Sequence, residues 1–324
     1  MSPNVKLDMK DRRILYELDS NARQSASQIA KRVKLNKNTV NYKINRLMAE
    51  GVISNFYAVI DNAKLGYFSF RIYAKFFNTA PQNEEEIINW LKANPKVGIV
   101  ARIETIYDLV FMVWVKDIYE FDAFWLEFKR KFRKYLWNET VHVFPAVWHF
   151  KRKYLLEEKA QAREPYEFIG EHKLVKHDQL DCEILKLLVR DARTSIVELS
   201  EKLKVPPRTI AFRIKRLEKE KVIQGYRVAI NLEKIEHEYY KINMVLNDFE
   251  KYDRLLSFAK NHPNIIYIDK TLSDLDFEID VEIKNRQELL KLLGWIKSNF
   301  SVRDMEIFSF KEFYKLETIP QSLE

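Results

Sequence analysis

The stretch LNKNTVNYKINRL, residues 35–47, has the pattern of an amphipathic helix whose exposed positions carry no acidic residue. Val40, Ile44 and Leu47 recur at i, i+4 and i+7 and form its apolar face. The absence of Asp and Glu is wider than the helix, because it extends over residues 20–49. Since solvated helices usually mix both signs of charge, a surface of one sign is typical of a segment that meets a polyanion.

The same scaffold returns 170 positions later as VPPRTIAFRIKRL, residues 205–217. Aligned without a gap, residues 11–53 and 181–223 are identical at 15 of 43 positions. There are two copies, each far longer than a solenoid unit, so the repeat indicates domain duplication. In each copy two helical patterns precede this stretch, and an alternating apolar run follows it at residues 52–61 or 222–231. Three helices and a short hairpin describe a winged helix-turn-helix.

The positive charge is concentrated in these two copies. The chain of 324 residues has a net charge of +8, while residues 7–53 and 181–227 carry +5 each, which leaves −2 for the remainder. Two short basic segments in an otherwise slightly acidic chain are the pattern expected of nucleic-acid contact. The single cysteine, Cys182, excludes internal disulfides and thiolate zinc sites, and its spacing predicts a buried position. With neither an apolar leader nor a run of 18 apolar residues, we expect a cytoplasmic protein without membrane segments.

A second unit follows each winged helix, and its predicted order is βαββαβ, a ferredoxin-like sandwich. In the first copy we predict strands at residues 68–77, 96–105, 108–115 and 140–155, and helices at 84–94 and 119–136. Residues 239–316 repeat this order in the second copy. The predicted α+β chain comprises winged helix-turn-helix 1 (1–61), a ferredoxin-like domain (62–156), a linker (157–179), winged helix-turn-helix 2 (180–231) and a second ferredoxin-like domain (232–324).

A winged helix that opens with the pattern LD..DR.IL..L...AR and is followed by a βαββαβ domain resembles the Lrp/AsnC (feast/famine) transcriptional regulators. The matching residues are Leu7, Asp8, Asp11, Ile14, Leu15, Ala22, Arg23, Val40, Ile44, Leu47, Gly51, Ile53, Tyr107 and Asp108. The resemblance covers nearly the whole chain twice and implies a regulator that binds double-stranded DNA, with RAM-type βαββαβ domains. Family members pair two chains through these domains, so this tandem is expected to form the pair within the chain or between two chains.

The resemblance implies that helices 36–49 and 206–219 are the recognition helices in the major groove. Exposed residues near their N-termini would then meet bases, and surrounding cations would meet phosphates. The base candidates are Lys37, Asn38, Asn41 and Tyr42, and in the second copy Arg208, Ala211 and Phe212. The phosphate candidates are Lys31, Lys43 and Arg46, and in the second copy Lys204, Arg213, Lys215 and Arg216. Because the scaffold letters repeat while the exposed letters differ, we expect the two halves to prefer different DNA sequences.

No cofactor, metal or catalytic residue is predicted. His142 and His149 lie an odd number of residues apart on one expected strand and therefore face opposite ways. The six glycines show no nucleotide-binding spacing. An amino-acid effector is disfavoured too, because family members that bind one carry Gly in a TG.YD turn, where this chain has Ile106 and Asp274. Most aromatic residues are expected in cores, among them Trp114, Trp125, Trp137 and Trp148.

Two alternatives stay open. Sirohaem decarboxylases resemble fused or paired Lrp/AsnC proteins and place His and Arg on the middle strands around a HNY.R.H.YN pattern. The corresponding residues 99–111 and 266–277 contain no His, and the second segment is acidic where a polycarboxylate would dock, so we predict that the chain is not an enzyme. The other alternative is a regulator that acts mainly through protein contacts with basal transcription factors or RNA polymerase.

Overall fold

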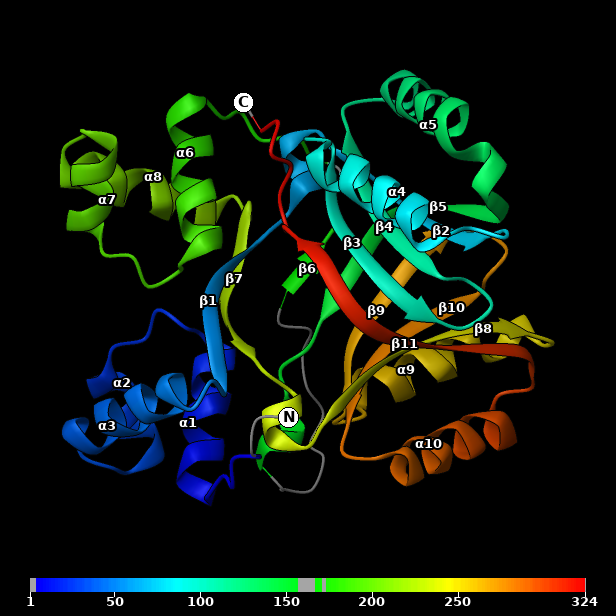
Figure 1. Cartoon of the computed structure of the whole chain (residues 1–324). Coiled ribbons are helices and arrows are strands. Elements are labelled where there is room, and N and C mark those ends of the chain that lie inside the picture. The colour runs from blue at the N-terminus through cyan, green and yellow to red at the C-terminus, as the bar shows by residue number, and fades with distance from the viewer. Residues whose placement is uncertain (1–3, 157–166, 171–172, 324) are drawn as a thin grey trace.

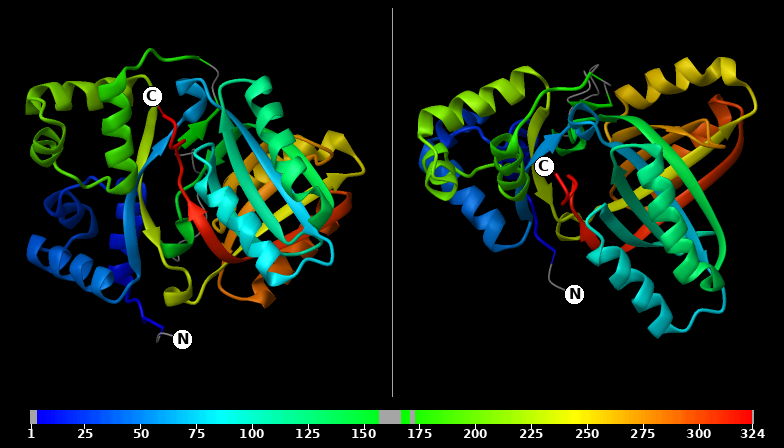
Figure 2. Two further views of the ribbon diagram at one scale, coloured as in Figure 1. Left: turned by 45° about the horizontal axis from the view of Figure 1, so that its top comes forward. Right: turned by 90° about the horizontal axis from the view of Figure 1, so that it is seen from above.

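The computed structural model describes residues 4–156, 167–170 and 173–323. Two winged-helix domains lie on one side of the molecule, and a closed β-barrel with its covering helices lies on the other (Figure 1). A two-stranded ribbon, β1 with β7, runs between them. The two further views in Figure 2 keep this separation of helical domains and barrel.

Each winged-helix domain contains the three helices predicted from sequence. Winged-helix domain 1 has α1 (Met9–Ser20), α2 (Ala26–Val33) and α3 (Lys37–Ala49), and winged-helix domain 2 has α6 (Gln179–Arg190), α7 (Ile196–Leu203) and α8 (Pro207–Lys219). The Asn36 side chain caps α3 by accepting a hydrogen bond from the backbone N–H of Thr39 at 2.7 Å. In α8 a proline occupies the first helical position instead, where a missing N–H costs nothing.

The prediction of a hairpin after the third helix of each winged-helix domain is wrong. Each copy contributes one strand, β1 (Ile53–Ile60) or β7 (Ile223–Ile230), and the two pair antiparallel with each other. Ile53 lies opposite Ile230 and Tyr57 lies opposite Arg227, so the axis that relates the two copies passes through the Tyr57–Arg227 pair. Among the described residues no other strand pairs with β1 or β7, so the backbone groups of each strand find their partners in the other copy.

The two βαββαβ units form in the predicted order. RAM-type domain 1 contains the 3₁₀ helix η1 (Asn62–Leu65), β2 (Phe68–Phe76), α4 (Pro81–Ala93), β3 (Val97–Glu104), β4 (Leu109–Val115), α5 (Ile118–Phe132), η2 (Arg133–Tyr135), β5 (Leu136–His149) and η3 (Lys153–Leu156). RAM-type domain 2 contains η4 (Glu233–Ile235), β8 (Glu238–Leu246), η5 (Phe249–Lys251), α9 (Tyr252–Asn261), β9 (Ile265–Leu272), β10 (Phe277–Ile283), α10 (Arg286–Asn299) and β11 (Val302–Leu316). The largest difference between predicted and observed bounds concerns the last strand of the first copy, which was predicted at residues 140–155 and is β5, Leu136–His149.

The two RAM-type domains close into one barrel within the chain. The strand orders inside the domains are β5-β2-β4-β3 and β11-β8-β10-β9. The last strand of each domain then pairs with the second strand of the other domain, β11 with β3 and β5 with β9. Closure leaves no strand of the eight with an open edge. Of the two pairings predicted from sequence, the structure therefore shows the one within the chain.

Four hydrophobic clusters hold these parts together. One cluster runs through both winged-helix domains and includes Trp114 from the barrel. Two clusters lie between the barrel strands and the helices on their outer side, α4 with α5 and α9 with α10 (Figure 1). The smallest cluster, which includes Tyr73, Ile103 and Phe308, lies inside the barrel. Cys182 is fully buried, as predicted. Trp137, in contrast, is 67% exposed and lies beside Phe77 with its ring tilted against it, contrary to the expected core position.

The predicted linker, residues 157–179, is not wholly irregular. Within it β6 (Glu167–Ile169) pairs antiparallel with β5, and Asp178 caps α6. Residues 157–166 and 171–172 lie outside the described part of the chain. Among the described residues, none of the helices combines the length and apolar character that a bilayer span requires.

Candidate nucleic-acid interface

The predicted base-contact residues lie on the solvent side of α3 and α8. Lys37, Asn38 and Asn41 are exposed, and the Tyr42 side chain is 68% exposed. In the second copy Arg208 is exposed and Phe212 is 66% exposed, while Ala211 between them is half-buried. The aromatic rings at the matching positions 42 and 212 are mostly exposed, which makes them available to a partner.

In the first copy, two of the residues predicted to contact phosphates are paired with acids of their own domain. Lys43 is buried, with its Nζ 2.7 Å from a carboxylate oxygen of Asp8 and 2.8 Å from one of Asp11. Arg46 forms an ion pair of 2.7 Å with Asp11 and lies 3.8 Å from Glu50. These two cations therefore fasten α3 to the start of α1, and their charges are already neutralised inside the domain.

The electrostatic coupling of this cluster appears in the pKa values. Burial alone lowers the pKa of Lys43, but the hydrogen bonds that its ammonium donates to Asp11 and Asp8 outweigh this effect and raise the pKa. Burial likewise raises the pKa of Asp8 by itself, yet the bond from Lys43 and the backbone N–H of Asp11 lower it to about 2. The Asp8 carboxylate is thus held ionised by its partners.

The second copy repeats the arrangement with two further predicted phosphate contacts, Arg213 and Arg216. Arg213 donates to Asp178 at 2.6 Å and to Asp181 at 3.1 Å. Arg216 forms an ion pair with Asp181 and lies 3.8 Å from Glu220. Asp181 is the counterpart of Asp11, and both are fully buried. The sequence signal for this role was present, because Asp11, Arg46 and their counterparts are among the identical positions of the repeat.

The other three predicted phosphate contacts, Lys31, Lys204 and Lys215, are exposed, and none forms a salt bridge with any described residue. Lys204 occupies the left-handed turn that leads into α8, with a φ of 54°. Its counterpart Lys34 has the same conformation before α3, with a φ of 55°, and is also exposed. We therefore add Lys34 to the candidates, which sequence reasoning missed although the two lysines are identical in the repeat.

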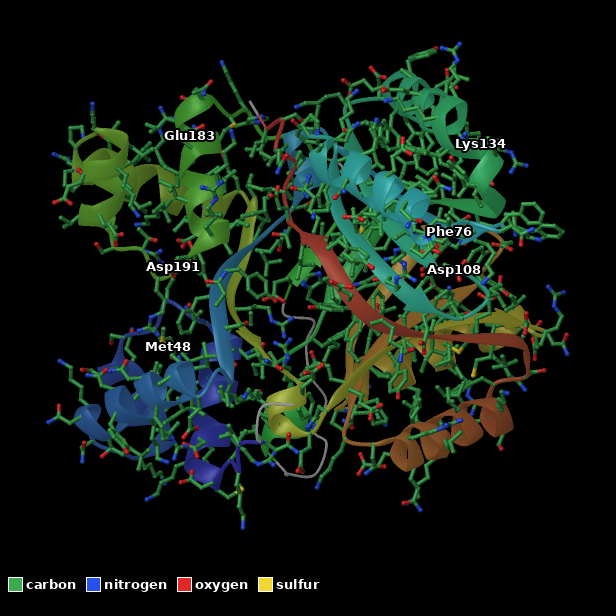
Figure 3. All side chains as sticks on the ribbon, in the orientation of Figure 1. Met48, Phe76, Asp108, Lys134, Glu183 and Asp191 are labelled. Atoms are coloured by element: carbon green, nitrogen blue, oxygen red, sulfur yellow. The ribbon has the colours of Figure 1, made fainter. Side chains whose placement is uncertain are left out.

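Asp108, which the family pattern singled out, has a structural role at the end of the barrel. Its carboxylate accepts hydrogen bonds from the backbone N–H of Phe76 and from Lys75, both at 2.8 Å (Figure 3). In the second copy Asp276 accepts from the backbone N–H of Leu246 at 2.7 Å. Both carboxylates thus tie the turn between the middle strands to the end of the first strand.

Inside the barrel, cations come from both copies but acids from one. Arg71 on β2 lies 2.7 Å from Asp269 and 2.7 Å from Glu278. Lys241, its counterpart on β8, pairs with Asp269, Glu278 and Asp280. All five side chains are buried. In the first copy, the positions equivalent to the three acids by strand register are occupied by the uncharged residues Ala101, Val110 and Met112. Among the described residues no three His, Cys, Asp or Glu groups are placed to hold a metal ion.

Comparison with known proteins agrees with this architecture. A family model described as winged helix-turn-helix DNA-binding matches residues 7–54 and 177–224. The uncharacterised HTH-type transcriptional regulator PH0140 of Pyrococcus horikoshii is 34% identical over 126 residues, which are 39% of this chain and 78% of that protein. The uncharacterised HTH-type transcriptional regulator PF0864 of Pyrococcus furiosus is 33% identical over 44% of this chain and 92% of its own length.

One similar structure spans the whole tandem. The crystal structure of the siroheme decarboxylase NirDL superposes with a TM-score of 0.62, covering 97% of this chain and 94% of that one, at 14% sequence identity. At that identity the likeness concerns the fold alone, and it includes the duplicated winged helices and the eight-stranded barrel. The family follows from the regulator relatives and the two matched winged helices: the chain belongs to the Lrp/AsnC-like HTH-type transcriptional regulators.

Proposed function

We propose that this protein is a sequence-specific regulator of transcription that binds double-stranded DNA with α3 and α8 in the major groove. The observation that carries the proposal is the β1–β7 ribbon, which fixes two winged-helix domains of one chain on the same side of the barrel (Figure 2). A single chain then presents two recognition helices. Half-sites for such paired helices lie about one helical turn, roughly 34 Å, apart.

The two helices would read different bases. Asn41 offers an amide that pairs bidentately with adenine, whereas Arg208 offers a guanidinium that pairs bidentately with guanine. Tyr42 and Phe212 occupy matching positions and both add aromatic contact area, but only Tyr42 carries a hydroxyl group. Because the two half-sites face unlike helices, the DNA site need not be palindromic. Contacts with basal transcription factors or RNA polymerase, or with a second copy of the chain, would accompany this binding rather than replace it.

Phosphate contacts would come from the exposed lysines only. Lys31, Lys34, Lys204 and Lys215 are unpaired with acids among the described residues, so each can release a counterion when it meets a phosphate. The internal ion pairs of Lys43, Arg46, Arg213 and Arg216 leave them little to gain from DNA.

The test is selection of duplexes from a random library by the purified full chain at two salt concentrations. We expect enrichment of a site with two unlike halves, and an affinity that falls steeply with salt. Asn41→Ala should relax selectivity at one base pair in one half only, by about 1–3 kcal/mol, and Arg208→Ala should do so in the other half. Asn138→Ala, an exposed asparagine on barrel strand β5, is the matched control and should change neither half. Two identical halves, or no enrichment, would contradict the proposal.

A second candidate function arises from the full-length likeness to the siroheme decarboxylase. We propose that this chain does not share that activity, since β3 and β9 contain no histidine and the second copy supplies three buried acids to the barrel interior. Because the three acids outnumber Arg71 and Lys241, the two cations that pair with them, a polycarboxylate would meet a net negative charge there. Absorbance titration with iron-uroporphyrin III tests this point: we expect no shift of the Soret band. A tight complex together with absent DNA affinity would favour the enzyme.

A further inference from the structure

A pocket of about 70 Å³ lies at the end of the barrel that carries the turns between the middle strands. Tyr73 and Thr140 are cross-strand neighbours in its wall, and so are Asn243 and Glu306. The first pair joins β2 to β5 and the second joins β8 to β11, so the two pairs are equivalent in the two copies. The pocket therefore lies on the axis that relates the copies.

The two sides of this pocket differ in charge. The second copy contributes three acids, Asp274, Asp304 and Glu306, whereas the first contributes Tyr73, Tyr107, Thr140 and His142. Within the described chain, no lysine or arginine is within ion-pair distance of those three acids. Their nearest basic group is the His142 imidazole, whose Nε2 is 3.9 Å from Asp274 and whose Nδ1 is 3.8 Å from Glu278.

The acids are not neutralised from deeper in the barrel either. Arg71 and Lys241 lie below the pocket and are already shared among Asp269, Glu278 and Asp280. Burial raises the pKa of Glu306, and the neighbouring carboxylates of Asp304 and Asp274 raise it further. A bound cation would relieve this repulsion.

A second observation points to a ligand with N–H donors. Asn243 is 1% exposed and lines the pocket, and its Oδ1 has no hydrogen-bond partner. An unsatisfied buried acceptor costs about 1–3 kcal/mol, so a group that donates to it is favoured. Because Glu306 is the cross-strand neighbour of Asn243, an amide oxygen and a carboxylate lie together at one site.

We propose that this pocket binds the ammonium head of a small aliphatic diamine. The head has three N–H donors, which suit Asn243 and Glu306, and the rings of Tyr73, Tyr107 and Phe308 provide apolar and cation–π contact for the stem. The volume is about half of the roughly 150 Å³ of an engineered cavity that binds benzene, so it suits a head group rather than a ring. The stem leads outward past Asp274 and Asp304, which are exposed and meet a second ammonium group.

The chemistry distinguishes this ligand from the alternatives. A carboxylate on the ligand, as in an α-amino acid or a tetrapyrrole, would face the three acids. A metal ion would need converging ligands, and the acids of the pocket are not placed in that way. The site also depends on the joining of two unlike copies in one chain. In a dimer of identical chains, each pocket acid would face the same acid of the other chain across the axis.

The test is isothermal titration of the full chain with 1,4-diaminobutane, in parallel with 1-aminobutane, 1,4-butanediol and succinate. We expect saturable binding of one diamine per chain, weaker binding of the monoamine, and no binding of the diol or the dianion. Glu306→Gln should weaken diamine binding about tenfold or more, since a hydrogen bond to a charged group contributes about 1.5–3 kcal/mol. Asp304→Asn, at an exposed position, should weaken it less.

Glu312→Gln is the control, because Glu312 is an exposed residue of the same strand whose cross-strand neighbour is Arg102 rather than a pocket residue. It should leave diamine affinity unchanged, and circular dichroism of every variant should match the parent. Absence of diamine binding, equal affinity for the diol, full affinity in Glu306→Gln, or displacement of the diamine by Mg²⁺ would each overturn the proposal. No DNA is present in this experiment, so its failure would leave the proposed DNA binding untouched.

Discussion

Replacing Asp19 with asparagine removes the charge at the centre of a buried ionic network that joins winged-helix domain 1 to the barrel. Asp19 on α1 accepts hydrogen bonds from Arg152 at 2.6 Å and from Arg227 at 2.8 Å. Arg152 is in turn bound by both carboxylate oxygens of Glu282 on β10, at 2.7 and 2.9 Å. Asp19 and Arg227 are 0% exposed, so water cannot take the place of a missing partner.

The expected loss is large for a single isosteric change. Without Asp19, Arg227 retains Glu167 at 3.9 Å as its nearest carboxylate, and that group has a pKa raised well above its ordinary value, first of all by burial. Removing one partner of a buried ion pair typically costs about 3–5 kcal/mol. In a chain of 324 residues that corresponds to a fall in melting temperature of about 4–7 °C. The loss of unfolding free energy is measured by guanidinium unfolding and the fall in melting temperature by thermal unfolding, both followed by circular dichroism.

The pH dependence has a definite sign. Burial raises the pKa of Asp19, but the charges of Arg227 and Arg152 outweigh it and hold the pKa below its ordinary value. Such a group stabilises the fold above its unfolded pKa near 3.8, and the stabilisation disappears as the pH falls through the folded value. The parent should therefore lose stability below about pH 4 more steeply than Asp19→Asn does.

The duplication supplies a matched control for this change. In the other copy, position 189 is valine where position 19 is aspartate, and position 57 is tyrosine where position 227 is arginine. The double variant Asp19→Val/Arg227→Tyr removes both charges of the pair and should be more stable than Asp19→Asn, because it leaves no buried guanidinium without a counterion. A loss below about 1 kcal/mol in Asp19→Asn, equal to that of the exposed Asp122→Asn, would refute this account of the network.

Three further outcomes follow from individual contacts. Lys43→Met should destabilise winged-helix domain 1 by about 1–3 kcal/mol and leave the salt dependence of DNA binding unchanged, whereas Lys31→Met should reduce the slope of log affinity against log salt by about 0.9. Gly98→Ala should cost about 1–3 kcal/mol in denaturant unfolding, because its new Cβ would lie 1.5 Å from the buried Trp114 ring. Burial raises the pKa of Asp61 to about 6, so the parent should lose stability relative to Asp61→Asn as the pH rises from about 4 to 6, measured by thermal melting.

Much of the fold was predictable because its signals are local. Val40, Ile44 and Leu47 have the helical period, Asn36 has the chemistry of a cap, and both lie within one short segment. The pairing of β1 with β7 was not predictable in this way. A strand with one buried side looks the same whether its partner follows after a tight turn or lies 170 residues away.

For the candidate site, the exposure of the residues was predictable from the sequence, whereas their ion pairs within the domain were not. Asn41 and Arg208 lie on the outer sides of their helices, and helical spacing reveals that without knowledge of the neighbours. Lys43 has the same charge as Lys31, but it lies beside the apolar face of α3, where α1 brings Asp8 and Asp11 to it. A cation count cannot separate the two, because the acids that neutralise Lys43 come from another helix.

The asymmetry of the barrel and of the ribbon restricts how the two copies can be combined. At the axis of the ribbon, Tyr57 faces Arg227, and two copies of the second half would place two fully buried arginines opposite each other. In the barrel, two copies of the first half would bury Arg71 twice without any of the acids that pair with it. Either combination leaves buried charges of one sign, which costs several kcal/mol per ion. The unlike halves are therefore required partners of each other in the folded chain.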